Sequence, residues 1–126
     1  MIDGNNVFGS RPDGWWRDRA GAAQRLAHRV DRWQAVVGEP VTLVFDGAAV
    51  GAISALERDG LAVRFAPGPG PDAADRWIVA EVEGLSTATP EVVVVTADRG
   101  LIVALPPGVA VEGPATFLAR LDEAGV

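Results

Sequence analysis

The chain has 126 residues, of which 48% are hydrophobic and 22% are charged, with no cysteine and a single histidine. This length and composition are typical of one packed domain, so we expect residues 1–126 to form a single domain. The lack of cysteine excludes disulfides and thiolate metal sites, and one histidine excludes zinc motifs that need a histidine pair. The longest apolar run, at 101–111, is broken by two prolines and falls short of the ~18 residues of a membrane helix. With no secretory leader at its start, the sequence predicts a cytoplasmic protein with no membrane partner.

Charge is distributed unevenly along the sequence. All 11 cations are arginines, and residues 11–32 hold six of them against three aspartates, so this stretch carries a charge of +3. The whole chain has a net charge of −6, so an acidic body carries one arginine-rich segment. Two interpretations fit the segment: a solvated helix face laced with ion pairs, or an edge that grips phosphate. Arginine suits the second role because its planar guanidinium matches the oxygens of a phosphate.

Apolar runs and helical periodicity alternate along the chain. In chain order, the sequence predicts a strand stub at Met1–Ile2, a helix at Gly14–Val37, a strand at Val41–Phe45, a strand at Leu61–Phe65, a helix at Asp72–Glu83 capped by Asp72, a strand at Val92–Thr96, a weaker strand at Val109–Val111 and a helix after Gly113-Pro114. The segment Ala48–Arg58 fits either a short helix or an irregular excursion. The Gly/Pro-rich stretch 67–71 is interpreted as a loop.

Alternation of strands and helices over this length predicts an α/β fold. We expect a three-layer α/β/α sandwich around a central, mostly parallel sheet of four to five strands. The run Val92–Val95 consists of four valines without polar alternation, so both faces of that strand should be covered by helices. The last helix should bury Phe117, Leu118 and Leu121.

Four aspartates stand at or just after predicted strand ends. Asp3 and Asp46 directly follow the first two strands, Asp98 follows the fourth, and Asp75 lies in the first turn of the helix after the third. Each alone is explained as a turn former or a helix cap. Because the carboxyl ends of parallel strands meet at one edge, we expect the four to converge there. Clustered carboxylates favour a hard cation such as Mg²⁺ or Mn²⁺, which predicts metal-assisted hydrolysis of phosphodiester bonds.

The motifs around these aspartates resemble those of the small bacterial NYN-domain proteins of the PIN-like nuclease superfamily. The resemblance covers residues 1–121 and rests on four motifs in this order: Asp3-Gly4-Asn5-Asn6-Val7 with Gly9-Ser10, then Phe45-Asp46-Gly47, then Pro71-Asp72-Ala73-Ala74-Asp75, and then Thr96-Ala97-Asp98-Arg99-Gly100-Leu101. It implies a PIN-like sandwich, an acidic Mg²⁺ or Mn²⁺ site and endoribonuclease activity on RNA.

The resemblance also implies roles for individual residues. Asp3, Asp75 and Asp98 match the catalytic aspartates and, together with Asp46, the metal ligands. Asn6 matches the family's asparagine, which would hold the loop or a metal-bound water. The supporting hydroxyl next to the site would come from Thr96. Independently of the resemblance, we expect Arg11, Arg17 and Arg99 to grip the phosphate backbone.

Three departures from the family pattern keep other functions open. Only Met1–Ile2 precede the first aspartate, Arg76 stands where a second acid is frequent, and Ala97 replaces a serine. One alternative is a non-catalytic RNA-binding or regulatory module with the same fold. Another is a toxin-like nuclease held by a regulatory protein partner.

Two adjacent tryptophans lie at the start of the first long helix. The apolar stripe of this helix consists of Trp16, Ala20, Ala23, Ala27, Val30 and Trp33. Trp16 therefore fits the buried face, and Trp15 would be exposed at the rim, where it could stack on an RNA base. The alternative is that both pack beneath the preceding loop. An exposed Trp15 or Trp77 would also favour a homodimer.

Overall fold

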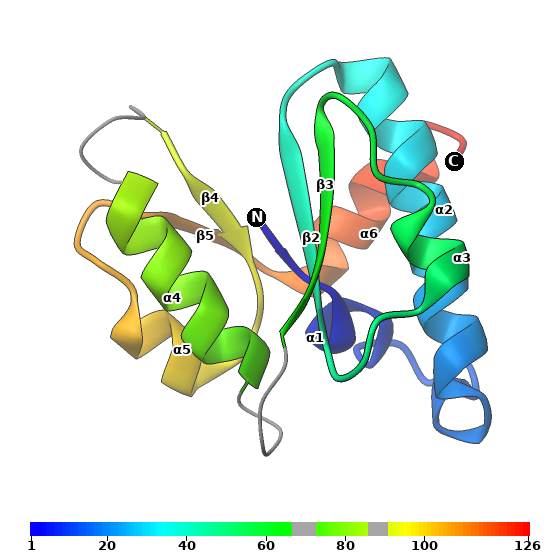
Figure 1. Cartoon of the computed structure of the whole chain (residues 1–126), viewed down its shortest axis with the longest axis horizontal. Helices are drawn as coiled ribbons and strands as arrows, with labels where there is room; N and C mark the ends of the chain where they lie inside the picture. Colours follow the sequence, from blue (N-terminus) through cyan, green and yellow to red (C-terminus); the bar gives the residue numbers. More distant parts are fainter. Residues whose placement is uncertain (67–72, 86–90) are drawn as a thin grey trace.

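The computed structural model describes residues 1–66, 73–85 and 91–126. A five-stranded sheet runs through it in the order β3-β2-β1-β4-β5, and all four pairings are parallel (Figure 1). The strands are β1 (Ile2–Asp3), β2 (Val41–Asp46), β3 (Leu61–Ala66), β4 (Val93–Val95) and β5 (Ala110–Glu112). The helices are α1 (Gly4–Phe8), the 3₁₀ turn η1 (Trp15–Arg17), α2 (Arg19–Val37), α3 (Gly51–Ser54), α4 (Ala73–Leu85), α5 (Arg99–Ala104) and α6 (Pro114–Glu123).

Two hydrophobic clusters, one on each face of the sheet, create three layers. The first cluster joins the sheet to α1, α2, α3 and α6, and the second joins it to α4 and α5. Successive residues of one strand point to opposite faces of the sheet, so Val94 packs in the second cluster and Val95 in the first. The predicted α/β/α sandwich with a parallel sheet is therefore confirmed. None of the helices in the described residues is long and apolar enough to span a membrane.

The first long helix starts later than predicted. Gly14 has a left-handed backbone (φ +87°) and leads into the separate turn η1, after which the Asp18 carboxylate accepts the Gly21 amide (2.9 Å) and caps α2. This break changes the direction of the two tryptophans. Trp16 is 52% exposed, whereas Trp15 packs against the first cluster, so the predicted burial of the pair is reversed.

Burial of the fourth strand is only partly as predicted. Val94 and Val95 are buried, but Val93 is 41% exposed. Val93 lines a cavity at the amino edge of the sheet, beside the two-residue β1, so within the described residues its side chain is not packed as Val94 and Val95 are. The expectation that helices cover both faces is wrong at this end of β4.

Other elements follow the sequence with small shifts. Helix α6 buries Phe117, Leu118 and Leu121 as predicted, and the ambiguous segment contains the short helix α3. The predicted cap Asp72 and the loop 67–71 lie outside the described residues. The sequence did not predict α1 and α5, which begin directly after Asp3 and Asp98.

Candidate active site

Three neighbouring strands end in the predicted acidic residues. Asp3 closes β1, Asp46 closes β2, and Asp98 follows β4 by three residues. Since β1 lies between β2 and β4, these ends are adjacent at the carboxyl edge of the sheet. The strand order changes direction at β1, and in open parallel sheets that point forms a crevice where ligands bind. The topology thus brings the three aspartates to the expected edge.

Asp3 is the buried member of this group. Only 4% of its surface is exposed, and its Oδ2 accepts a hydrogen bond from the Thr96 hydroxyl at 2.9 Å. Burial raises the pKa of Asp3 from 3.8 to about 6, with smaller upward contributions from the charges of Asp46 and Asp98. The hydrogen bond from Thr96 opposes part of this rise. Asp3 is therefore a carboxylate held in an environment that penalises its negative charge.

Thr96 connects Asp3 to Asp98. Its hydroxyl donates to Asp3 and also accepts the Asp98 amide at 3.1 Å, while the side chain is 1% exposed. The Asp98 Oδ1 accepts the Leu101 amide at 3.0 Å and so caps α5. The predicted supporting hydroxyl thus orients one carboxylate and the backbone that carries the next.

Two consecutive asparagines on α1 connect β1 to both of its neighbours. The Asn6 side-chain oxygen accepts the Ala97 amide at 2.8 Å, on the β4 side. The Asn5 side-chain oxygen accepts the Asp46 amide at 2.9 Å, on the β2 side. The loop-holding role expected of Asn6 matches this contact. Asn5 received no role from the sequence, although its place beside Asn6 in the motif was the available signal.

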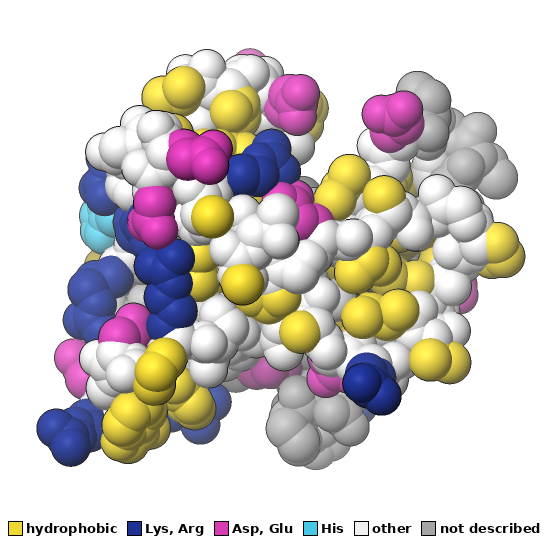
Figure 2. Space-filling view, turned by 180° about the vertical axis from the view of Figure 1, so that it is seen from behind, with side chains coloured by type: hydrophobic (Ala, Val, Ile, Leu, Met, Phe, Trp, Pro, Cys, Tyr) yellow, Lys and Arg dark blue, Asp and Glu magenta, His cyan; other side chains and the backbone are white. Residues whose placement is uncertain are grey.

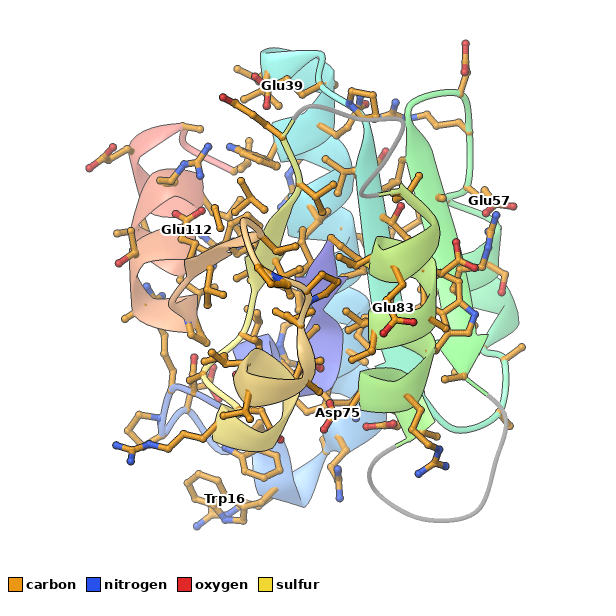
Figure 3. The ribbon with its side chains drawn as sticks, turned by 90° about the vertical axis from the view of Figure 1, so that its left-hand side faces the viewer. Trp16, Glu39, Glu57, Asp75, Glu83 and Glu112 are labelled. Carbon is orange, nitrogen blue, oxygen red and sulfur yellow. The ribbon has the colours of Figure 1, made fainter. Side chains whose placement is uncertain are left out.

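Asp46 positions the start of α4. Its Oδ1 accepts the Ala74 amide at 2.7 Å, in the first turn of that helix. Asp75 is the next residue and is half-buried. Figure 3 shows Asp75 at the same end of the molecule as the exposed Trp16. Asp46 thus caps the start of α4. Because Asp75 lies in the same first turn, this contact holds Asp75 near the carboxyl edge.

The acidic residues of this edge suit a metal ion in type but not in grouping. No three acidic or histidine side chains within residues 1–66, 73–85 and 91–126 lie close enough together to hold one. The chemistry of the set nevertheless suits a hard cation, because it consists of carboxylates and its buried member, Asp3, is penalised when charged. Asp46 and Asp98 each use one oxygen in a helix cap, and within the described residues the other oxygen accepts no hydrogen bond. The residues fit Mg²⁺ or Mn²⁺ by type, while the expected common cage is not formed.

The predicted phosphate-gripping arginines differ in their surroundings. Arg11 forms an ion pair with Asp122 of α6 at 2.9 Å, and Arg29 contacts the same carboxylate at 2.6 Å. Arg17 and Arg99 are exposed and form no ion pair within the described residues. Figure 2 shows arginine side chains gathered along the side of the molecule formed by α2. The ion-pair interpretation of the arginine-rich segment therefore holds for Arg11 and Arg29, and phosphate binding by Arg17 and Arg99 stays a prediction.

The three tryptophans considered above also have distinct environments. Trp15 lies 6.0 Å from the Phe8 ring, and the Arg19 guanidinium lies 5.6 Å from the Trp15 centroid. Trp16 meets Trp15 edge-on at 5.9 Å and keeps half of its surface exposed. Trp77 is half-buried against the second cluster. Trp16 is therefore the more exposed ring of the adjacent pair, and stacking on RNA stays a prediction.

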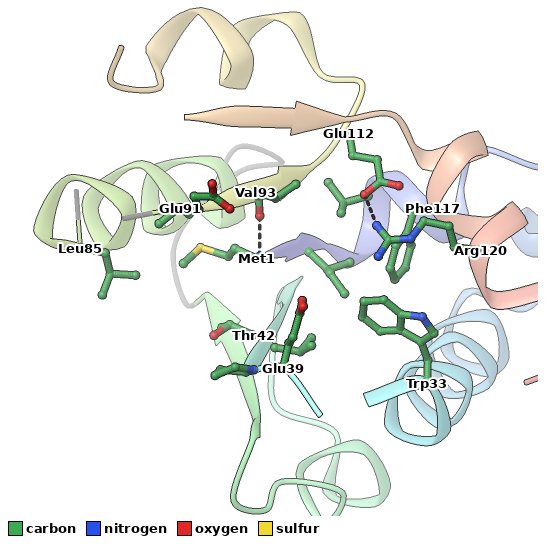
Figure 4. A pocket seen from close by; sticks show the side chains of 15 residues that line it. Met1, Trp33, Glu39, Thr42, Leu85, Glu91, Val93, Glu112, Phe117 and Arg120 are labelled. Atoms are coloured by element: carbon green, nitrogen blue, oxygen red, sulfur yellow. Dashed lines mark hydrogen bonds and ion pairs between the residues drawn. The ribbon is translucent and has the colours of Figure 1, made fainter. Parts of the chain in front are cut away.

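A large cavity lies away from the aspartates, at the amino edge of the sheet. It has a volume of about 510 Å³ and is lined by the starts of β1, β2 and β4 together with Trp33 and Arg120 (Figure 4). The Met1 amine donates to the Val93 carbonyl at 2.7 Å in its wall, and burial lowers the pKa of that amine to about 6. None of the predicted site residues lines this cavity.

Comparisons with known proteins agree with this architecture. The sequence matches the YacP-like NYN domain over residues 1–121. Two crystal structures of Rae1 (YacP) from Bacillus subtilis are similar in fold. One superposes with a TM-score of 0.77 at 20% identity and covers 98% of this chain and 73% of its own. The other, a tryptophan-to-leucine mutant, has a TM-score of 0.76 at 21% identity and covers 98% and 74%. No curated protein matches the sequence.

Proposed function

The chain belongs to the YacP-like NYN domain family, and from that premise we propose that it is a metal-dependent endoribonuclease that hydrolyses RNA phosphodiester bonds in the cytoplasm. Membership supports a nuclease-like function related to RNA in general. The observation that carries the finer proposal is the buried Asp3 carboxylate, hydrogen-bonded to Thr96 and close enough to Asp46 and Asp98 for their charges to raise its pKa. A purely structural aspartate gains nothing from two further carboxylates at the same edge.

The carboxylates divide into two roles. Asp3, Asp75 and Asp98 would be the primary ligands of Mg²⁺ or Mn²⁺, and Asp46 would support them while it holds the start of α4. Asn6 and Thr96 would orient them through the hydrogen bonds described above. When bound, the ion would polarise a phosphate oxygen and lower the pKa of a water molecule. The side chains of this edge would hold the scissile phosphate at that position.

RNA would reach this edge along exposed cationic and aromatic side chains. Arg99 lies in the first turn of α5, directly after Asp98, and Arg17 ends the turn that carries Trp16. A guanidinium at each side would contact backbone phosphates, and Trp16 would stack on a base. Arg11 is assigned a structural role instead, because its guanidinium is engaged by Asp122.

The test is cleavage of a mixed, end-labelled RNA pool by the purified protein in Mg²⁺ or Mn²⁺, with EDTA as the metal-free arm. Asp98→Asn should abolish cleavage, because it removes a charged ligand and keeps a side chain that can cap α5. Asp59→Asn is the matched control, since Asp59 is an exposed aspartate in the turn before β3. Cleavage that persists in EDTA, or that Asp98→Asn leaves intact, would contradict the proposal.

A second candidate function is favoured by one observation. The carboxylates of the described residues do not form a group that could hold a metal ion. An RNA-binding or regulatory module would keep the fold and the arginines without cleavage. Retention of RNA on a filter with no cutting in either metal would support this alternative.

A further inference from the structure

A recess of about 310 Å³ opens beside Asp46 and has no part in the roles assigned above. It lies between the first turns of α2 and the loop that leads from β2 into α3. Asp46 and Asn5 belong both to the recess and to the acidic edge. A group held in the recess would therefore be a direct neighbour of the acidic site.

Three phenylalanine rings form the floor of the recess. The rings of Phe45 and Phe65 are stacked with centroids 5.8 Å apart, and Phe8 lies 6.4 Å from Phe45. Phe45 and Phe8 are buried, whereas Phe65 is half-buried. Phe65 is thus the ring that a flat ligand would reach. On the opposite wall, Ala23 of α2 presents only a methyl group, which leaves the floor open.

The rim of the recess is polar on one side and cationic on the other. The Asn5 side-chain oxygen accepts the Asp46 amide, and within the described residues its NH₂ group, which lines the recess, donates to no other group. Arg19 lies on the α2 side, where its guanidinium covers the Trp15 ring and forms no ion pair with a carboxylate of the described residues. An apolar floor, an amide donor and a nearby guanidinium match the three parts of a nucleotide: base face, base edge and phosphate.

We propose that this recess binds one nucleobase of the RNA, stacked on Phe65 and adjacent to the acidic edge. This inference rests on the proposed function for its biological setting. Stacking on an aromatic ring accepts any base, and the Asn5 donor would add a preference for bases with an acceptor at the edge that faces it. Arg19 would contact the phosphate of the same nucleotide. The recess would thereby fix which phosphodiester bond lies at the carboxylates.

The experiment compares adenosine 5′-monophosphate with ribose 5-phosphate, which lacks the base, as ligands of the metal-free protein in NMR titrations. The nucleotide should shift the amide resonances of Ala23, Gly47 and Phe65, and ribose 5-phosphate should not. Ala23→Leu would fill the recess and should abolish these shifts. Ala35→Leu is the matched control, because Ala35 lies on the exposed side of the same helix. Phe65→Leu, which keeps an apolar residue but removes the ring, should weaken nucleotide binding about tenfold.

The outcomes separate this inference from the proposed function. Equal shifts with both ligands, no shifts at all, or unchanged binding by Ala23→Leu would overturn the base site, whether or not the protein cleaves RNA. Shifts confined to the recess in a protein that cleaves no RNA would uphold the base site and reject the nuclease. In the active protein, Ala23→Leu should weaken the binding of a short RNA and leave the binding of an abasic oligonucleotide of equal length unchanged.

Discussion

The two edges of the sheet are built in opposite ways. At the carboxyl edge, Thr96 donates to Asp3 while Asn5 and Asn6 accept backbone amides, so that these side chains connect three strand ends around the buried Asp3. At the amino edge, the starts of β2 and β4 flank a cavity of about 510 Å³ beside the two-residue β1. Cavity volume and the proposed chemistry therefore do not coincide in this fold. The cavity of about 510 Å³ lies beside the two-residue β1, whereas the proposed catalytic residues lie where side chains join neighbouring strand ends.

The largest effect that should distinguish the two edges is on cleavage. Asp3→Asn keeps the hydrogen bond from Thr96 but removes the central charge, so RNA cleavage in Mn²⁺ should fall at least about 100-fold, which corresponds to the several kcal/mol that metal-held charge contributes. Thr42→Val, at the amino-edge cavity, is the control and should retain activity. Comparable losses in both variants, measured as initial rates, would remove the functional distinction between the edges.

The second prediction concerns pH, because each edge carries one group with a shifted pKa. The pKa of Asp3 is raised to about 6, so the folded state binds its proton more tightly, and the free energy of unfolding should fall as pH rises from 4 to 6. The pKa of the Met1 amine is lowered from 8.0 to about 6, so its contribution should rise from pH 6 to 8. From these two groups alone, each contributing about 2–3 kcal/mol, stability passes through a minimum near pH 6.

Urea unfolding of the metal-free protein at pH 4, 6 and 8 measures the free energy of unfolding on both sides of this minimum, the acidic limb (pH 4 to 6) and the alkaline limb (pH 6 to 8). Asp3→Asn should remove the pH dependence of the acidic limb and leave that of the alkaline limb unchanged. Because the chain contains no lysine, an amine-specific acetylating reagent modifies only the Met1 amine and should flatten the alkaline limb. A variant or modification that alters the opposite limb would contradict the assignment of these groups.

A third prediction tests the connection between strands. Thr96→Val removes a hydroxyl that serves both Asp3 and the Asp98 amide in a buried position. Leaving these partners unsatisfied should lower the free energy of unfolding by about 1–3 kcal/mol at pH 7. Thr96→Ser, which keeps the hydroxyl, should recover most of this loss in the same urea titration. No recovery by serine would mean that the methyl group, and not the hydrogen bonds, stabilises the junction.

The smallest effect compares two valines of one strand. Val95 is 4% exposed, whereas Val93, two residues nearer the amino edge, is 41% exposed. Val95→Thr should cost about 1–2 kcal/mol because it buries a hydroxyl, and Val93→Thr should change stability by less than about 0.5 kcal/mol. Equal losses in thermal unfolding would show that the amino edge is as tightly packed as the rest of the sheet.

The sequence predicted the carboxyl edge better than the amino edge. Asp3, Asp46 and Asp98 could be placed there because a parallel sheet brings its strand ends together, whatever the details of packing. Their hydrogen bonds could not be predicted, since Thr96 and Asp3 lie 93 residues apart and nothing local indicates the contact. The sequence also missed α1 and α5, because helices of five and six residues are too short to display periodicity.

The reversed tryptophans show where the helical pattern was misleading. Trp16 lies at the correct spacing from the buried residues of α2, so periodicity favoured its burial. The left-handed Gly14 starts the separate turn η1, and α2 begins only after its cap at Asp18. The helical periodicity of α2 therefore does not extend back to Trp16. A glycine and an aspartate in these positions were visible signals of a late helix start.

If the proposed metal site forms, the paired asparagines of α1 would bear on its ion selectivity. Asn5 and Asn6 extend in opposite directions and fix the Asp46 backbone on one side and the loop before Asp98 on the other. A single helix of five residues thus contacts the backbone that carries both of these carboxylates. Cations differ in radius, and Ca²⁺ needs oxygens about 0.3–0.5 Å farther away than Mg²⁺ does. Discrimination between the two ions at this edge would then depend on the length and tilt of α1. Two uncharged side-chain amides would thus influence which ion the carboxylates bind.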